Sequence, residues 1–302
     1  MSVINTNISS LQAANASNSA RMMQSTAMQQ LSTGLKINSA ADNAAGLAIS
    51  NTMTSQINGM TQAVQNSNDG IALAQTAGGG LSEVTNMLQR VRQLAVQSSS
   101  GTYQASDRSS MQTEVSNLTQ QMSSIITSTQ FNGVNVFAVT SGVPATDGSQ
   151  DAKFTIQTGA NSSATSGNTV VIDSQAFNGT AFFGTTGGTG NTSYSAASGT
   201  TQSLDVTSAA SAATTITNVD SALTGVNTTQ ASLGAAQNRL TSVVNNLNTN
   251  ITNLSSARSQ IQDTDYSAST TQLAKSQILA QASNAMLAQA NQSQQSVLSL
   301  LK

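Results

Sequence analysis

The sequence contains no histidine, no cysteine and no tryptophan, and it has a single proline, Pro144. Without histidine or cysteine the chain has no Ser/His/Asp triad, no thiolate nucleophile, no usual zinc site and no disulfide. Glutamate occurs only at Glu83 and Glu114. These absences exclude most catalytic chemistry, so we expect a protein that is not an enzyme and that needs no metal or cofactor.

Charge is also scarce: 7% of residues are charged and the formal net charge is -2, against about a quarter in typical proteins. The chain therefore offers no basic face for nucleic acid. No span approaches the ~20 apolar residues of a membrane helix, and the first residues lack the basic and apolar regions of a secretory signal peptide. We expect neither a nucleic-acid nor a membrane partner. Weak charge suits a polymer of identical subunits, because it avoids accumulated self-repulsion.

The strongest positive signal is a heptad pattern that runs from Val219 to Ile261. Large apolar residues fill one heptad position: Val219, Val226, Leu233, Leu240, Leu247, Leu254 and Ile261. We place the second seam position at Leu223, Gln230, Gln237, Val244, Ile251 and Arg258. A helix of this length spans roughly 65 Å at about 1.5 Å per residue. Its flanking positions carry almost no charge, which favours a multi-helix assembly over an isolated dimeric zipper.

Two further helices are predicted in the first half of the chain. A weaker stripe contains Met53, Met60, Ala74, Leu81, Leu88 and Ala95, with Ile57, Val64 and Ile71 at the other heptad position. Gly78, Gly79 and Gly80 interrupt it, each at about 1 kcal/mol against alanine. The next helix, capped by Ser106 or Asp107, carries Met111, Val115, Leu118, Met122 and Ile125. Short loops between such stripes predict a mainly α fold built on a long antiparallel helical bundle.

We expect the bundle core to be formed by Ile57, Val64, Leu81, Leu88, Leu118, Leu233, Leu240, Leu247 and Leu254. The middle of the chain has a different pattern. FNGVNVF at 131–137, KFTIQTGAN at 153–161 and TVVID at 169–173 predict short strands and β-hairpins. Residues 178–202 have few apolar anchors, so we expect a short outer segment that is either a small lobe or a loop.

Both ends of the chain carry thinner apolar stripes. One contains Ile4, Ile8 and Leu11 and resumes at Met22, Met28, Leu31 and Leu35; the other contains Leu279, Met286, Ala290, Val297 and Leu300. Isolated helices of this kind are marginal in water, so we expect both ends to be poorly ordered in the monomer and to fold when subunits meet. Asp42 and Asn43 predict an N-cap for a helix starting near Ala44. Asp263 and Asp265 predict a turn and an N-cap in preference to a metal site.

Several motifs resemble those of one known family. They are LSTGLKINSAADNAAGLAI at 31–49, NDGIALAQTA at 68–77, LQRVRQLAVQ at 88–97, FNG at 131–133, LGAAQNRL at 233–240, NLSSARSQIQDTDY at 253–266, QILAQASNAMLAQANQ at 277–292 and SVLSLL at 296–301. In this order and at both ends, they resemble bacterial flagellin over most of residues 1–137 and 205–302.

The resemblance implies a structural subunit that self-assembles into the extracellular helical filament of the bacterial flagellum, for motility. Residues 1–44 and 266–302 would form an inner tube of terminal coiled-coil helices. Residues 45–177 and 203–265 would form a helical spoke with β-hairpins, and residues 178–202 a variable outer segment. The inner-tube assembly residues would be Ile4, Ile8, Leu11, Leu279, Met286, Val297 and Leu300.

The resemblance also implies partners besides other copies of the chain. They are the flagellar type III export apparatus, which passes the chain unfolded, an export chaperone, and the hook-associated and cap proteins. By resemblance, Gln89, Arg90, Leu94 and Glu114 would contact the Toll-like receptor for flagellin. The segment departs from the family at Gln93, where flagellins usually carry glutamate, and Gly78 and Gly80 stand where they usually carry glutamate and alanine.

Two alternative functions are weighed against the filament subunit. The hook–filament junction protein of the same superfamily shares the terminal helices, but the FNG, LGAAQNRL and SVLSLL motifs resemble the main filament subunit. An enzyme displayed on a filament, such as a protease, is disfavoured because a His-Glu zinc motif requires histidine.

Overall fold

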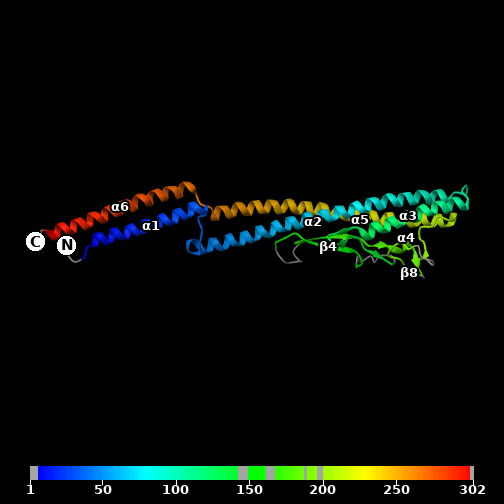
Figure 1. Cartoon of the computed structure of the whole chain (residues 1–302), viewed down its shortest axis with the longest axis horizontal. Helices are drawn as coiled ribbons and strands as arrows, with labels where there is room; N and C mark the ends of the chain where they lie inside the picture. Colours follow the sequence, from blue (N-terminus) through cyan, green and yellow to red (C-terminus); the bar gives the residue numbers. More distant parts are fainter. Residues whose placement is uncertain (1–5, 142–148, 161–166, 187–188, 196–199, 300–302) are drawn as a thin grey trace. The chain divides into compact units, whose positions relative to one another are not determined.

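The computed structural model describes residues 6–141, 149–160, 167–186, 189–195 and 200–299. Their helices are α1 (Ile8–Thr33), α2 (Ala40–Ser99), α3 (Ala105–Ser128), α4 (Gly179–Phe183), α5 (Ala209–Gln262) and α6 (Tyr266–Ser299) (Figure 1). The predicted mainly α fold with long helices and small β elements is confirmed. Among the helices described here, none combines the length and the apolar character needed to cross a membrane.

The chain divides into two compact units, which we describe separately. One unit contains Met1–Asn58 and Asn250–Lys302, and the other contains Gly59–Thr249. The first unit therefore holds α1, α6 and the adjoining ends of α2 and α5. The second holds the rest of α2 and α5, together with α3, α4 and the strands.

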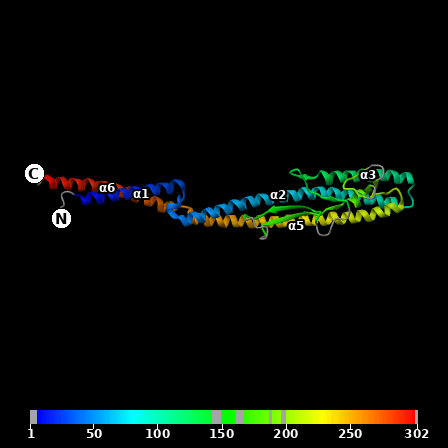
Figure 2. The same cartoon turned by 90° about the horizontal axis from the view of Figure 1, so that it is seen from below.

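In the second unit, α2 runs beside α3 and α5 (Figure 2). The three helices share one apolar core, with Leu81, Leu88 and Val91 from α2, Val115, Met122 and Ile126 from α3, and Val226, Leu233 and Leu240 from α5. Exposed ion pairs link the helices at the edge of this core: Arg90 donates to Glu114 and Arg92 to Asp220, each over 2.7 Å. The hydrogen bond from Arg92 lowers the pKa of Asp220. Exposed pairs of this kind contribute little to stability because water and salt screen them, so apolar burial holds the bundle together.

The seam of α5 differs from the prediction at its second position. Buried residues follow one another at alternating steps of four and three: Val219, Ala222, Val226, Thr229, Leu233, Ala236 and Leu240. Leu223, Gln230 and Gln237, which were predicted to lie in the seam, are partly exposed at its edge. The reason is size, because Ala222, Thr229 and Ala236 allow neighbouring helices to approach closely. These positions are used within the subunit and are not free for neighbouring rods.

The start of α3 also lies a little earlier than expected. The helix begins at Ala105 with Gln104 as its N-cap, and Asp107 is the third residue of the helix. The Asp107 carboxylate accepts a hydrogen bond from the Gln104 backbone N–H over 3.0 Å, which completes a capping box. Asp107 therefore stabilises the N-terminus from inside the helix and is not the cap itself.

Short strands cover one side of the second unit. They are β1 (Gln130–Phe131), β2 (Val134–Asn135), β3 (Val139–Thr140), β4 (Ala152–Gln157), β5 (Thr169–Ser174), β6 (Phe177–Asn178), β7 (Thr185–Thr186), β8 (Thr189–Gly190) and β9 (Thr200–Thr201). The predicted hairpins are β1–β2, which turns at Asn132 and Gly133 with positive φ, and β4–β5. The β4–β5 hairpin packs against the bundle through Ile156, beside Gly70 of α2 and Leu240 of α5.

The outer segment is better anchored than the sequence suggested. Phe182 and Phe183 of α4 are buried, and Phe182 makes an edge-to-face contact with Phe177, which in turn contacts Phe137. The expectation of few apolar anchors in residues 178–202 is wrong for this reason: two adjacent phenylalanines in a Gly- and Thr-rich segment are enough to join it to the core. Part of this segment, residues 187–188 and 196–199, lies outside the described residues.

Candidate assembly surface

The first unit is organised around an antiparallel pair formed by α1 and α6 (Figure 1). Among the described residues, side-chain hydrogen bonds join the two helices along their length. Asn7 donates to the Ala290 carbonyl over 3.1 Å, Ser17 to Asn284 over 3.1 Å, and Gln272 to the sulfur of Met23 over 3.6 Å. The residue numbers rise in α1 as they fall in α6, so the start of α1 lies beside the end of α6.

Small side chains face the partner helix along this pair. In α1 a set of buried or partly buried residues recurs at steps of three and four, with Ala14, Met23 and Gln30 partly buried beside it: Ser10, Ala13, Ser17, Ala20, Gln24, Ala27 and Leu31. In α6 the corresponding set is Ser269, Leu273, Ser276, Ala280, Ser283, Leu287 and Ala290. Ala20, Ala27 and Ser276 are almost fully buried. A seam built mostly from Ala and Ser lets two helices pack closely while burying little apolar area.

Other large apolar side chains of the same helices remain exposed, some of them along the edge of the seam. Seven of them are between 39% and 66% exposed: Ile8, Leu11, Met22, Met28, Ile278, Leu279 and Met286. We call these seven residues the terminal apolar face. Arg21 and Lys275 are the charged residues of α1 and α6, which contain no acidic residue. Exposed apolar surface of this extent, with so little charge, is typical of an interaction site.

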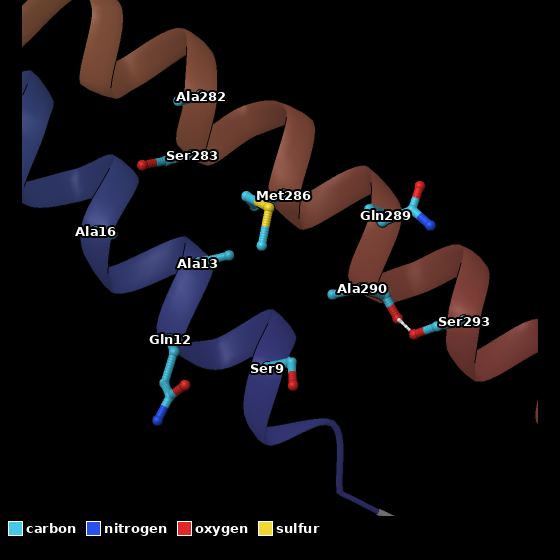
Figure 3. Close-up of a pocket in the computed structure, with 10 residues that line it drawn as sticks. All are labelled: Ser9, Gln12, Ala13, Ala16, Ala282, Ser283, Met286, Gln289, Ala290 and Ser293. Carbon is cyan, nitrogen blue, oxygen red and sulfur yellow. Dashed lines mark hydrogen bonds between the residues drawn. The ribbon is translucent and has the colours of Figure 1, made fainter.

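An open groove of about 530 Å³ lies between α1 and α6 on this pair. Ala13 and Ala16 line it from α1, and Ala282, Met286 and Ala290 from α6, with Ser and Gln side chains at its rim (Figure 3). Met286 points from α6 toward Ala13. The groove has no paired acid and base and no cluster of metal ligands, and the described residues contain no such cluster elsewhere. Its chemistry is suited to apolar packing.

The inner-tube residues named from the sequence divide into two groups. Ile8, Leu11, Leu279 and Met286 lie on the terminal apolar face. Ile4 and Leu300 lie outside the described residues, and Val297 lies in α6 although its side chain is not described. The sequence reasoning missed Ile278, which is as exposed as Met22. The recurrence of Ala and Ser along α1 and α6 could have identified Ile278, because it marks the positions where the two helices pack and so shows which positions remain exposed.

The expected core residues also occupy different environments. Leu81, Leu88, Leu233, Leu240 and Leu247 are buried, whereas Ile57, Val64, Leu118 and Leu254 are only partly buried. Of the receptor residues implied by resemblance, Gln89 and Arg90 are exposed, Glu114 is partly exposed, and Leu94 is 3% exposed within the bundle core.

The connectors of the first unit join α1 to α2 and α5 to α6. A backbone bridge pairs Leu35 with Asp263, and the Lys36 N–H donates to the Gln262 carbonyl over 2.7 Å. The predicted caps are confirmed here. The Asn43 side chain accepts from the Gly46 N–H over 2.9 Å at a non-helical backbone, and Asp265 accepts from the Ser267 N–H over 2.8 Å.

Asp42 has a different role from its neighbour Asn43. Its carboxylate accepts hydrogen bonds from the Ser39 and Asn38 backbone N–H groups over 2.9 and 3.1 Å. These backbone donors lower the pKa of Asp42, so the carboxylate is ionised and fixes the turn before the helix. Asp263 likewise accepts a hydrogen bond from the Ser259 hydroxyl. The acidic residues of the connectors therefore serve structural hydrogen bonds.

The fold and this surface are those of a helical structural protein with an unpartnered apolar face. Family comparisons match residues 4–142 to the bacterial flagellin N-terminal helical region and residues 216–301 to the bacterial flagellin C-terminal helical region. Flagellin of Bacillus subtilis (strain 168) is 40% identical, with 99% of each chain covered. Flagellin C of Vibrio anguillarum is 34% identical, again with 99% of each chain covered.

A crystal structure of Bacillus cereus flagellin is also similar, at 27% identity and a TM-score of 0.43, covering 61% of this chain and 88% of that one. The chain belongs to the bacterial flagellin family. It is a structural subunit of the flagellar filament, which is extracellular, and flagellins associate with copies of themselves to form it.

Proposed function

We propose that this flagellin polymerises through the terminal apolar face, with residues 1–44 and 266–302 forming an inner tube. The observation that supports the proposal is the pattern of α1 and α6, in which Ala and Ser make up most of the seam while Ile8, Leu11, Met22, Met28, Ile278, Leu279 and Met286 are exposed. Heterologous contacts between identical subunits give an open helix when the rotation does not close. Covering this face with other copies buries apolar area that the isolated subunit leaves in water.

Substitutions on the exposed face test this proposal without disturbing the seam. In the triple variant Leu11→Ser, Ile278→Ser and Met286→Ser, each changed side chain is exposed in the subunit, so the subunit stays folded. Each truncation removes roughly 1.5–3 kcal/mol of apolar burial at every contact that covers it. We expect no filaments by electron microscopy and a monomer by sedimentation.

A matched control changes three exposed polar positions of the same helices: Asn18→Ser, Gln277→Ser and Gln281→Ser. This variant has the same number of new serines but an intact apolar face, so it forms filaments like the parent. Filaments of normal yield from the Leu11, Ile278 and Met286 variant would overturn the proposal.

We further propose that residues 45–177 and 203–265 form a spoke outside the tube, with residues 178–202 outermost.

We also propose that the type III apparatus exports the chain unfolded. The lack of cysteine supports unfolded export, because no disulfide can lock the folded chain. An export chaperone and the hook-associated and cap proteins are the corresponding partners. A copy number of about ten per cell, in place of thousands, would instead indicate the hook–filament junction protein.

Recognition by the Toll-like receptor for flagellin is proposed on the surface formed by Gln89, Arg90 and Glu114. Arg90 donates to Glu114 over 2.7 Å and to Gln93 over 3.4 Å, so the exposed side chains form a connected polar surface. Leu94, the fourth contact in the proposal, is 3% exposed beneath this surface. A reporter-cell assay with the purified subunit tests the proposal, and an absent response contradicts it.

A further inference from the structure

Methionine is the side chain of this protein that peroxide oxidises most readily. The chain has ten methionines and lacks cysteine, tryptophan and histidine, which would otherwise compete for an oxidant. Methionine sulfoxide is reversible by sulfoxide reductases, and it converts a flexible apolar side chain into a polar one. The effect of oxidation on this protein therefore depends on where its methionine sulfurs lie.

The exposed methionines of the described chain lie on the terminal apolar face. Met22, Met28 and Met286 are 66%, 51% and 64% exposed. The methionines of the second unit are covered instead: Met60, Met111 and Met122 are buried, and Met87 is partly buried. Met23, next to Met22 in α1, is partly buried and its sulfur accepts a hydrogen bond from Gln272. The accessible sulfurs and the unpartnered apolar surface thus coincide.

We propose that Met22, Met28 and Met286 form a redox-sensitive modification site, and that their oxidation to the sulfoxide in the free subunit blocks assembly. The proposal rests on the proposed function, because it requires that subunits associate through the terminal apolar face. The oxidant is a peroxide. The sulfur attacks one oxygen of hydrogen peroxide, and an S–O bond forms as the O–O bond breaks. The sulfur loses two electrons, and the other oxygen leaves as hydroxide, which takes the proton of the new S–OH group to give the sulfoxide and water.

The surroundings of Met286 explain why a sulfoxide there opposes assembly. Its side chain lies in the groove beside Ala13, Ala16, Ala282 and Ala290, whose side chains offer no hydrogen-bond donor, while Ser and Gln side chains line the rim (Figure 3). In the free subunit, water hydrates a sulfoxide oxygen through the open groove. A second copy covering the groove removes that water, and a sulfoxide oxygen held against the Ala side chains then has no donor there, which is costly. Met22 and Met28 lose water in the same way once the face is covered.

The same geometry makes assembly protect the site. In the polymer the three sulfurs are covered by neighbouring copies, so a peroxide no longer reaches them at the rate set by their exposure in the free subunit. Oxidation of these methionines consequently affects subunits before they assemble and does not dissociate finished filaments.

The first measurement maps oxidation in the folded free subunit by mass spectrometry after a short treatment with hydrogen peroxide. We expect Met22, Met28 and Met286 to react at least about ten-fold faster than Met60, Met111 and Met122, following their exposure. After such treatment the lag before polymerisation lengthens at least ten-fold, and a mixture of the two methionine sulfoxide reductases that act on the two epimers restores it. Equal oxidation rates at exposed and buried sites would overturn the site assignment.

The second measurement uses the variant Met22→Leu, Met28→Leu and Met286→Leu, which keeps the apolar volume and removes the sulfurs. We expect it to polymerise with or without prior peroxide treatment. The matched control, Met60→Leu, Met111→Leu and Met122→Leu, retains the exposed sulfurs and stays sensitive. A Leu variant on the terminal face that peroxide still inhibits would overturn the inference.

The two proposals fail in different ways. If the Leu11, Ile278 and Met286 to serine variant polymerises normally, the proposed assembly face is wrong, and the redox inference falls with it. If that variant fails to polymerise while the oxidised parent assembles at its normal rate, the assembly face stands and the redox inference alone is wrong.

Discussion

Gly79 and Gly80 are neighbouring residues of α2 that differ in what a side chain would meet. A Cβ atom at Gly79 has nothing within 4 Å, whereas one at Gly80 would lie 3.3 Å from both the Phe137 ring and the Thr129 hydroxyl oxygen. Both residues lie inside the helix, where glycine costs about 1 kcal/mol against alanine. Replacing glycine with alanine therefore increases the stability of the helix at Gly79 without a steric cost, whereas at Gly80 crowding opposes the increase.

We expect Gly79→Ala to stabilise the second unit by about 1 kcal/mol, which raises its melting temperature by about 2–4 °C. Gly80→Ala should give less than half of this gain, because the Phe137 ring or the Thr129 side chain must shift. Thermal unfolding of the two variants, followed by circular dichroism, measures the difference. A Gly80→Ala variant as stable as Gly79→Ala would mean that the contact at Phe137 relaxes without cost.

The α1–α6 pair depends, as an element, on the small size of its seam residues. Ala20 is 1% exposed, and Ser276 of α6 is fully buried. A leucine at Ala20 has no room in the seam and forces the helices apart, at a cost of typically 1–3 kcal/mol. The same substitution at Ala288, an exposed residue of α6, adds volume where only solvent lies.

Hydrogen exchange followed by mass spectrometry reports the opening of this pair in the full chain. In Ala20→Leu, the amides of α1 and α6 should exchange about ten-fold faster or more, because about 1.4 kcal/mol corresponds to a factor of ten. Amides of α2 between Leu73 and Ala95 should be unchanged, and Ala288→Leu should match the parent throughout. Unchanged protection of α1 in Ala20→Leu would show that the seam is not closely packed.

Helices and caps were the most predictable elements, and small-residue contacts the least. The large apolar residues of α5 correctly predicted which side of the helix is buried, since Val219, Val226 and Leu233 are buried as a heptad requires. Hydrophobic periodicity ranks residues by size, so it assigned the second position to Leu223 and not to Ala222. Close helix packing reverses that order, because alanine fits where leucine does not.

The same reasoning applies to the candidate site. The sequence identified Ile8, Leu11, Leu279 and Met286 as apolar residues in need of partners, but it could not show that α1 and α6 pair through their small residues. An apolar stripe of α1 or α6 is left for another copy only if the two helices pair through other residues, and the sequence does not show which residues they pair through. Phe182 and Phe183 escaped prediction for a related reason, since a short aromatic pair in a polar segment has no periodicity.

The whole molecule has few groups whose charge changes near neutral pH or responds to salt. No histidine or cysteine is present, so no side chain has an ordinary pKa between about 5 and 8. The two helices that carry the terminal apolar face contain two cations, Arg21 and Lys275, and no acid. Association through this face therefore depends on apolar burial, which salt screening leaves unchanged.

We expect the critical concentration for polymerisation to change by less than about two-fold between pH 6 and pH 8 and between low and physiological sodium chloride. Sodium sulfate should lower it, because excluded salts strengthen apolar association. Sedimentation of the polymer from the free subunit measures each value. A critical concentration that rises steeply with sodium chloride would contradict apolar control and indicate charge pairing between subunits. Arg21 and Lys275 are the cations on α1 and α6, so Arg21→Gln and Lys275→Gln would then identify which one pairs with an acid of a neighbouring copy.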